Sequence, residues 1–505
     1  MSLLPDLPPP ALRCVAGGPT AARLAALDAL CLVVPPDADA ASLRGLPFAS
    51  EVGTLLAREK PKPGRCVSMT LPTSRQTLLV AGALREGAEA FERLSLAGEA
   101  LRAVLARDPA RIALATTPTR RDGDAVVEAL AAAALAQGFP LPSFVQPPQP
   151  RPALAEIDLH AGDGLDLRRL QAGAAASNLA RWLTALPPNV LDAAGYRRAL
   201  GAIARDTGLA LQWLGEPALR RLGAGAFLAV AAGNARRDAA GIARLTYRPR
   251  GRQGRGVPRI ALVGKGILFD TGGTNLKPHR SMLEMHTDMA GSALALGVLL
   301  ALAQLGAPFE VDCWLAITEN CIGPTAYRPQ DVVRACNGTT IQVIHTDAEG
   351  RMALADTLAL AARRAPRFIL DFATLTGACV NALTERKSGV FTNHPALGPL
   401  LEDAGRRSGE RVVCFPMDAD YDADLQSKVA DVLQCAVEGK GDHILAARFL
   451  SRFVPPGVAW AHVDLSAATR SGGLAHVATD ITGFGARFAL DLLLDQPLLA
   501  RLEPR

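Results

Sequence analysis

The chain has 505 residues, of which 49% are hydrophobic and 20% are charged. This length exceeds one ordinary hydrophobic core, so we expect a globular protein with two domains. The formal net charge of +5 is small for the length and gives no strong case for binding nucleic acid or a membrane surface.

The N-terminus and the cysteines bear on the location of the protein. The first residues, MSLLPDLPPP, lack the basic and long apolar regions of a signal peptide. The longest helical apolar run, residues 293–303, is shorter than the roughly 20 residues that span a bilayer. Nine scattered cysteines without CxxC pairs are typical of reduced thiols. We therefore expect a cytoplasmic protein without membrane contact.

The first part of the chain alternates apolar runs with helical patterns. The apolar runs predict strands at 29–34, 77–80 and 112–115. Ala-rich periodic segments predict helices at 88–107 and 124–137. This alternation is typical of a small α/β domain. A proline-rich stretch at 140–152 cannot continue a helix or a central strand, so we place this N-terminal domain at residues 1–150.

The remaining chain predicts a linker with a connecting helix and then a larger domain. We assign residues 151–185 to the linker, with a helix starting at Leu167, and residues 186–505 to the larger domain. Apolar runs in this domain predict strands at 260–263, 311–317, 341–344 and 368–372. Helical patterns follow at 289–305 and 351–364. The fold class is therefore α/β, and the larger domain is predicted to have a doubly wound, mostly parallel sheet.

Two acidic clusters follow predicted strands of the larger domain. Asp347 and Glu349 come after the apolar run 341–344, at the start of a helical pattern. Further upstream, Asp270 follows the strand at 260–263, and Asp288 opens a long helix. Ligands bind at the C-terminal edge of open α/β sheets, and four carboxylates converging there would repel one another without cations. The sequence therefore predicts a site for divalent metal ions, often two at once.

Three basic residues accompany these carboxylates. We expect Lys265 on the first turn after its strand, where it could ligate a metal only as the neutral amine. Lys277 follows a Gly-Gly turn and can reach a developing oxyanion as a donor. Arg351 lies at a helix N-terminus, which favours anions.

Several long motifs resemble those of the leucine aminopeptidase (cytosol aminopeptidase) family, in the same order. They include VGKGILFDTGGTNLKP (263–278), ENCIGPTAYRPQDVV (319–333), HTDAEGRMALAD (345–356) and DFATLTGACVNAL (371–383). The resemblance extends over most of the C-terminal two thirds of the chain. The N-terminal third matches no motif of this kind.

This resemblance implies a two-metal aminopeptidase that removes the N-terminal residue of peptides with a metal-activated water. It implies two divalent ions per subunit, Mn or Zn, held by Lys265, Asp270, Asp288, Asp347 and Glu349. It also implies that Lys277 and Arg351 are catalytic, with a bicarbonate bound at Arg351. The expected partners are peptides with a free N-terminus and further copies of the chain in a homohexamer.

Some features depart from the family, and other functions have to be weighed. His286 and His345 stand where the family usually has a basic residue and an asparagine, which changes the local hydrogen bonding and the polarity of the pocket. Residues 464–485 depart from the DIAG and GATG pattern of the family. The preference for the side chain of the cleaved residue therefore does not follow from the resemblance. A DNA-binding regulator on the same scaffold is an alternative, which the modest charge disfavours. A pseudo-enzyme scaffold is disfavoured because no ligand is missing. The Asp-Thr-Gly triplets at 206–208 and 270–272 do not indicate an aspartic protease, since the chain is not rich in strands. A zinc protease with histidine ligands is not indicated either, because no HExxH motif occurs.

Overall fold

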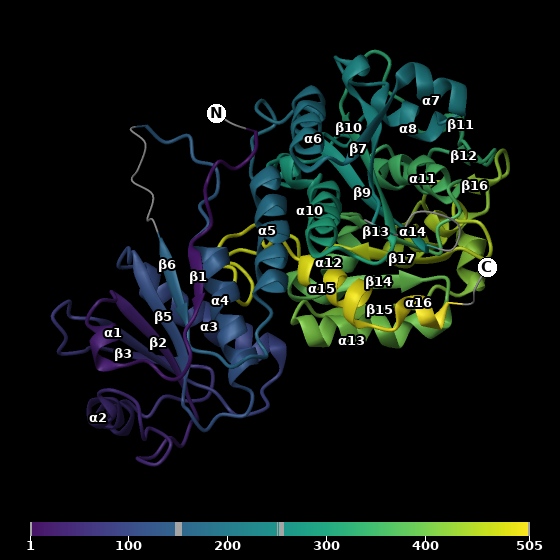
Figure 1. The fold of residues 1–505 in the computed structure, drawn as a ribbon. Helices are drawn as coiled ribbons and strands as arrows, with labels where there is room; N and C mark the ends of the chain where they lie inside the picture. Colours follow the sequence, from purple (N-terminus) through teal and green to yellow (C-terminus); the bar gives the residue numbers. More distant parts are fainter. Residues whose placement is uncertain (1–2, 147–153, 250, 252–256, 503–505) are drawn as a thin grey trace.

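The computed structural model of the protein describes residues 3–146, 154–249, 251 and 257–502. They form two α/β domains connected by a long helix, α5 (Leu167–Thr184). Figure 1 shows the smaller domain, in purple and blue, on one side of α5 and the larger domain, in teal, green and yellow, on the other side. The expected α/β class, with a smaller N-terminal and a larger C-terminal domain, is confirmed.

The smaller domain is built on a six-stranded sheet with the order β1-β6-β5-β2-β4-β3. Neighbouring strands are parallel except β3, which pairs antiparallel with β4 at one edge. β2 and β4 are buried along their whole length, as expected for parallel strands that are covered on both faces. The strands are β1 (Ala11–Cys14), β2 (Ala29–Val34), β3 (Cys66–Thr70), β4 (Leu78–Ala83), β5 (Arg111–Thr116) and β6 (Glu156–Leu159).

Helices cover both faces of this sheet. Successive residues of β2 point to opposite faces, so Cys31 packs with α3 and α4, whereas Leu32 packs with α1 and α2. This alternation gives the small domain two hydrophobic cores. The helices are α1 (Ala21–Leu24), α2 (Ala49–Glu59), α3 (Ala90–Leu105) and α4 (Gly123–Gln137).

The boundary that we placed at residue 150 leaves out one strand of the small domain. β6 comes after the proline-rich stretch, yet it pairs in parallel with both β1 and β5. The short segment Glu156–Leu159 has two charged residues among its four, so the sequence gives little indication of a strand, and its place is set by pairing with strands that are distant in sequence. The expected linker 151–185 therefore contains a strand as well as the connecting helix.

The larger domain is built on an eight-stranded sheet with the order β15-β14-β17-β13-β9-β10-β8-β7. The four central strands β17, β13, β9 and β10 are parallel, and antiparallel pairs flank them on each side. The doubly wound pattern therefore holds at the centre, where the site lies. The strands are β7 (Ala210–Gly215), β8 (Gly241–Tyr247), β9 (Arg259–Asp270), β10 (Glu310–Asn320), β13 (Phe368–Ala373), β14 (Ser388–Thr392), β15 (Val412–Cys414) and β17 (Ala459–Asp464).

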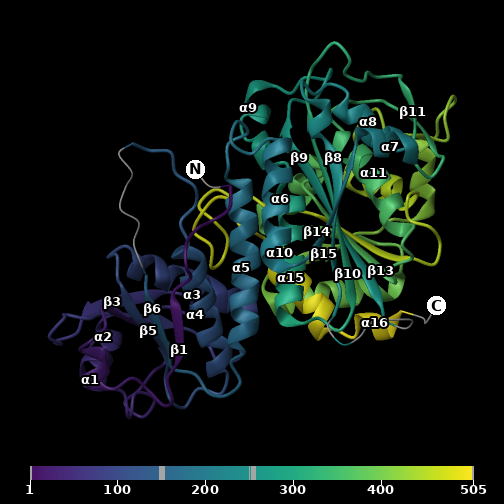
Figure 2. The ribbon, with the colours of Figure 1, turned by 45° about the horizontal axis from the view of Figure 1, so that its top comes forward.

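Two layers of helices enclose this sheet. α5, α6, α10, α13 and α15 pack on one face and share a core with Leu262 and Phe372. α7, α8, α11 and α14 pack on the other face with Val263 and Trp460. Figure 2 shows α5 and α10 running side by side along the first face. The helices are α6 (Ala193–Thr207), α7 (Glu216–Leu222), α8 (Gly225–Ala231), α9 (His279–Met282), α10 (Ala290–Leu305), α11 (Glu349–Ala362), α12 (Gly377–Leu383), α13 (Gly398–Ser408), α14 (Asp442–Ser451), α15 (Ala486–Leu490) and α16 (Leu498–Arg501).

Among the residues that the structure describes, one helical segment, His279–Leu305, is long and apolar enough to cross a membrane by length and composition. It exceeds the apolar run 293–303 because the short helical turns before α10 continue into it. Within the protein, 78% of its apolar window is buried. This burial is that of a core helix packed on the central sheet.

The strand expected at 341–344 does not belong to the main sheet. β12 (Thr340–Gln342) pairs with β11 (Val332–Arg334) and β16 (Val432–Leu433) in a separate three-stranded sheet. The expectation that Asp347 and Glu349 leave a strand of the main sheet is therefore wrong. They reach the C-terminal edge of that sheet from a small neighbouring sheet, through the loop before α11.

Candidate metal centre

The strand β9 brings Lys265 and Asp270 to the site. β9 is longer than predicted and continues to Asp270, so Lys265 is a buried residue within the strand and not, as we expected, on the turn after it. The glycines beside Lys265 allow this arrangement. A Cβ atom on Gly264 would lie 2.5 Å from Cα of Ser292, so only glycine permits α10 to begin so close to the strand.

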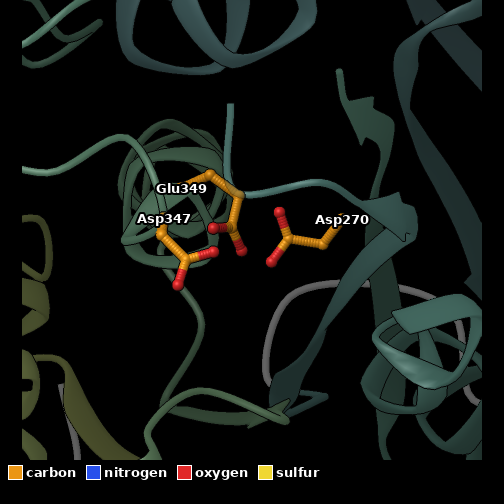
Figure 3. A group of neighbouring side chains, drawn as sticks. All are labelled: Asp270, Asp347 and Glu349. Atoms are coloured by element: carbon orange, nitrogen blue, oxygen red, sulfur yellow. The ribbon is translucent and has the colours of Figure 1, made fainter. Parts of the chain in front are cut away.

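Asp270, Asp347 and Glu349 converge in front of this strand. Each offers a carboxylate oxygen, and these oxygens lie within 4.8 Å of one another. Figure 3 shows Asp347, in the loop before α11, and Glu349, at the start of α11, on one side and Asp270, at the end of β9, on the other. Asp270 and Glu349 are buried, and Asp347 is partly exposed. Three of the four carboxylates that the sequence predicts to converge thus lie together.

Asp288 joins the cluster through Lys265. It is a buried residue just before α10, and its Oδ1 lies 2.8 Å from Nζ of Lys265. The same Nζ lies 3.0 Å from Oε1 of Glu349 and donates to the carbonyl oxygen of Thr374 at 2.9 Å. A Cβ on Gly350 would lie 2.5 Å from Cε of Lys265, so the glycine after Glu349 provides the space for this lysine.

Lys277 faces the cluster from the opposite side. Its Nζ lies 2.9 Å from Oδ2 of Asp270 and 2.5 Å from Oδ1 of Asp347. The loop that carries it turns at Gly272 and Gly273, which both have positive φ. The Lys277 N–H donates to the carbonyl oxygen of Thr271 at 2.9 Å, which closes the turn.

A reciprocal pair of hydrogen bonds connects this loop to the one before α11. The Asn275 N–H donates to Oγ1 of Thr346 at 2.8 Å, and the Thr346 N–H donates to Oδ1 of Asn275 at 2.9 Å. Thr346 directly precedes Asp347. Lys277 and Asp347 are therefore held on two segments that are bonded to each other.

Burial and mutual repulsion raise the pKa values of three carboxylates of the site. Burial, with the charge of Asp270, raises the pKa of Glu349 to about 8. Burial also raises the pKa of Asp288 to about 6 and that of Asp347 above its ordinary value. Burial alone would lower the pKa of Lys265 and of Lys277, but the neighbouring carboxylates raise both. The site thus gathers negative charge that the two lysines balance only in part.

Arg351 is buried on the first turn of α11, two residues after Glu349. Its Nη2 donates to Oδ2 of Asp442 at 2.7 Å, and its Nη1 donates to the carbonyl oxygen of Gln434 at 3.4 Å. The Asp442 charge raises the pKa of Arg351, against the lowering effect of burial. Nε of Arg351 has no hydrogen-bond partner among the described residues.

The structure brings six of the seven predicted site residues into one group, places Arg351 two residues after Glu349, and adds others that the sequence did not indicate. Thr374 donates its hydroxyl to Oδ1 of Asp288 at 2.7 Å, and the Asn320 amide donates to Oδ1 of Asp270 at 2.7 Å. Asp442 pairs with Arg351. Thr374 and Asn320 lie inside motifs that resemble the family, DFATLTG and ENCIGP, which was the one available signal for them.

The two histidines beside predicted ligands differ in their surroundings. His345 is exposed, and its Nδ1 accepts from the N–H of Asp347 at 3.2 Å, so it caps the turn that carries this carboxylate. His286 is partly buried, and burial lowers its pKa.

Sequence comparisons place the chain among known proteins. The catalytic-domain model of the cytosol aminopeptidase family matches residues 178–490. A probable cytosol aminopeptidase of Synechococcus sp. (strain JA-3-3Ab) is 35% identical over 458 residues, which cover 87% of this chain and 88% of the relative. One from Parasynechococcus marenigrum is 39% identical over 350 residues, which cover 68% of this chain and 71% of the relative.

Solved structures agree with this placement. A mutant of tomato leucine aminopeptidase matches with a TM-score of 0.84 and 25% identity, covering 98% of both chains. The bottromycin maturation enzyme BotP in complex with Mn matches with a TM-score of 0.78 and 31% identity, covering 92% of this chain and 98% of that one.

The fold and the acidic site define a metal-dependent hydrolase of N-terminal peptide bonds. The chain belongs to the cytosol aminopeptidase family, and its larger domain is the catalytic domain of that family. None of these likenesses supports the alternative of a DNA-binding regulator.

Proposed function

We propose that the chain removes the N-terminal residue of peptides with two divalent ions. The observation that supports this proposal is the convergence of Asp270, Asp347 and Glu349, with Asp288 joined to them through Lys265. The proposed protein ligands are Lys265, Asp270, Asp288, Asp347 and Glu349.

The donor atoms at the site fit such a pair of ions. Carboxylate oxygens with one amine are a set of ligands that suits Mn²⁺ or Zn²⁺. We propose that the two ions are of one or the other of these metals. Oδ2 of Asp288 is buried and has no hydrogen-bond partner among the residues that the structure describes, so it is available to a cation. Lys265 would bind as the neutral amine, and its proton would leave as the ions enter.

When bound, the ions would bind the free α-amine, polarise the scissile carbonyl and activate the attacking water. Lys277 would supply a preformed donor for that carbonyl oxygen as negative charge develops on it. Its Nζ already faces the cluster, where Asp270 and Asp347 orient it. Lys277 would therefore compete with the ions for these two carboxylates.

Arg351 would hold a bicarbonate anion beside the cluster. Two observations support this assignment: the guanidinium lies on the first turn of α11, whose N–H groups favour anions, and its Nε has no partner among the described residues. The ion pair with Asp442 fixes the orientation of the guanidinium.

Assembly and location extend the same proposal. We propose a cytoplasmic homohexamer that acts on peptides with a free N-terminus, supported by membership of the family and by the names of its relatives. Light scattering coupled to gel filtration tests the assembly, and the expected mass is six times the 52.9 kDa of the chain. A monomer mass would exclude the hexamer.

Mass spectrometry of a matched peptide pair tests the exopeptidase reaction. The two peptides share one sequence, and one of them carries an N-terminal acetyl group. We expect stepwise loss of N-terminal residues from the free peptide and no cleavage of the acetylated one, because acetylation removes the amine that a metal would bind. Equal cleavage of both peptides, or cleavage at internal bonds, would contradict the proposal.

A further inference from the structure

We propose that Asn320 is a positioning residue, which fixes the carboxylates of Asp270 and Glu349 in the orientation that receives the metal ions. This inference rests on the metal-binding role proposed above for these two residues. Asn320 is the last residue of β10 and is fully buried beside the end of β9.

One amide group of Asn320 connects three acceptors of the site. Its Nδ2 donates to Oδ1 of Asp270 at 2.7 Å, to the carbonyl oxygen of Thr346 at 3.0 Å and, more weakly, to Oε2 of Glu349 at 3.4 Å. The first and third acceptors are proposed ligands. The second is the carbonyl of the residue before Asp347. One neutral donor thus touches each segment that carries a member of the three-carboxylate cluster.

The main chain of Asn320 is attached to the segment after Asp270. The main-chain carbonyl oxygen of Asn320 accepts from both the N–H and the hydroxyl of Thr271, at 2.9 and 2.8 Å, which attaches the end of β10 to this segment. A Cβ on Gly273 would lie 3.1 Å from Oδ1 of Asn320 and 2.9 Å from Oγ1 of Thr346. The amide therefore fills the space that this glycine leaves.

These contacts distinguish the two carboxylate oxygens of Asp270. Oδ1 of Asp270 accepts from the Gly272 N–H at 2.8 Å and from Asn320, so both donors lie on one side of the carboxylate. Oδ2 is left to face Lys277 and the cluster. A neutral amide fixes this orientation without adding a positive charge that would compete with the ions. Donors of this kind typically tune metal affinity by about 10–100-fold.

Calorimetric titration of Mn²⁺ into metal-free protein tests the assignment. The variants are Asn320→Ala, which removes the donor, and Asn320→Leu, which removes it while keeping the side-chain volume where alanine would leave a cavity. The matched control is Asn234→Ala. Asn234 is also buried at β10, but its amide bonds Thr318 and Glu319 and contacts no proposed ligand.

We expect both Asn320 variants to bind Mn²⁺ about 10–100-fold more weakly than the wild type, and the control to bind with wild-type affinity. A merely structural role would lower the folded fraction, which near-UV circular dichroism reports, without changing the affinity of the folded protein. Unchanged Mn²⁺ affinity in folded Asn320→Leu would overturn the positioning role. Failure of the wild type itself to bind Mn²⁺ would instead overturn the metal site on which the inference rests.

Discussion

Nζ of Lys265, in the middle of β9, lies 3.0 Å from Oε1 of Glu349, on the first turn of α11. Both side chains are buried, and Gly350 provides the space for their approach. The same Nζ lies 2.8 Å from Oδ1 of Asp288, and removing a buried ammonium of this kind is costly because the carboxylate that it faces keeps its charge without a partner. Lys265 is therefore the internal counterion of the cluster when no metal is bound.

Replacing Lys265 by methionine should destabilise the metal-free protein. Methionine keeps the apolar stem and removes the charge that faces Asp288 and Glu349. We expect a loss of about 3–5 kcal/mol in the free energy of unfolding at neutral pH, measured by urea denaturation in the presence of a chelator. The control is Lys440→Met, at a highly exposed position. Equal stability of the two variants would show that Lys265 is not the counterion.

Removing Lys277 should affect turnover more than substrate binding. The proposed donor acts on charge that develops mainly in the transition state, so Lys277→Ala should lower kcat by about 10²–10³ with a smaller change in KM. Steady-state kinetics on a leucine amide chromophore measures both constants. Bound metal must be determined in the same samples, because Lys277 also contacts Asp270 and Asp347. A fully metallated variant with wild-type kcat would refute the oxyanion role.

Removing Arg351 should have a milder effect and should blunt any stimulation by bicarbonate. The proposed role is to hold an anion, and Arg351→Ala removes the guanidinium that would hold it. The measurement is kcat with and without added bicarbonate, compared with Arg328→Ala, a variant of an exposed arginine. A full bicarbonate response in Arg351→Ala would place the anion elsewhere.

Glu410 should make stability depend on pH outside the metal centre. Burial raises its pKa from 4.5 to about 7, although its Oε2 accepts from the Phe488 N–H at 2.8 Å. Between these values the native state binds the proton more tightly than the unfolded state, so the free energy of unfolding falls as pH rises. Above pH 7 the resulting loss in the free energy of unfolding is at most about 3 kcal/mol.

Glu410→Gln removes this ionisation and keeps the shape of the side chain. We expect the variant and the wild type to have similar free energies of unfolding near pH 4.5. The wild type should then lose stability relative to the variant as pH rises to 8. Denaturation across this range measures the difference. The control is Glu438→Gln, an exposed position, which should show no pH-dependent difference. A difference that stays constant with pH would mean that Glu410 does not carry the effect.

The sequence predicted the chemical identity of the site better than its local structure. Asp270, Asp347 and Glu349 are predictable because carboxylates that directly follow apolar runs indicate an acidic site at the end of strands. Lys265 was placed on a turn because the apolar run that predicts its strand ends at Val263, just before the glycines beside this lysine. In the structure these glycines allow close packing of α10 on a continuing strand.

Other features depend on contacts that one sequence does not contain. β12 pairs in a separate small sheet and β6 returns to the first domain, and both pairings involve residues distant along the chain. The contacts of Asn320 and Thr374 with the ligands likewise arise only when separate strands come together. Neither residue type has a pattern of its own that indicates such a role.

Metal dependence is the most direct test of the central claim. Purified protein should lose peptidase activity on treatment with a chelator and regain it with Mn²⁺ or Zn²⁺, and metal analysis of the restored enzyme should give two ions per chain. Asp347→Ala should remain folded and inactive under the same conditions, because it lacks one of the converging carboxylates. Full turnover by protein shown to be free of metal would contradict the account.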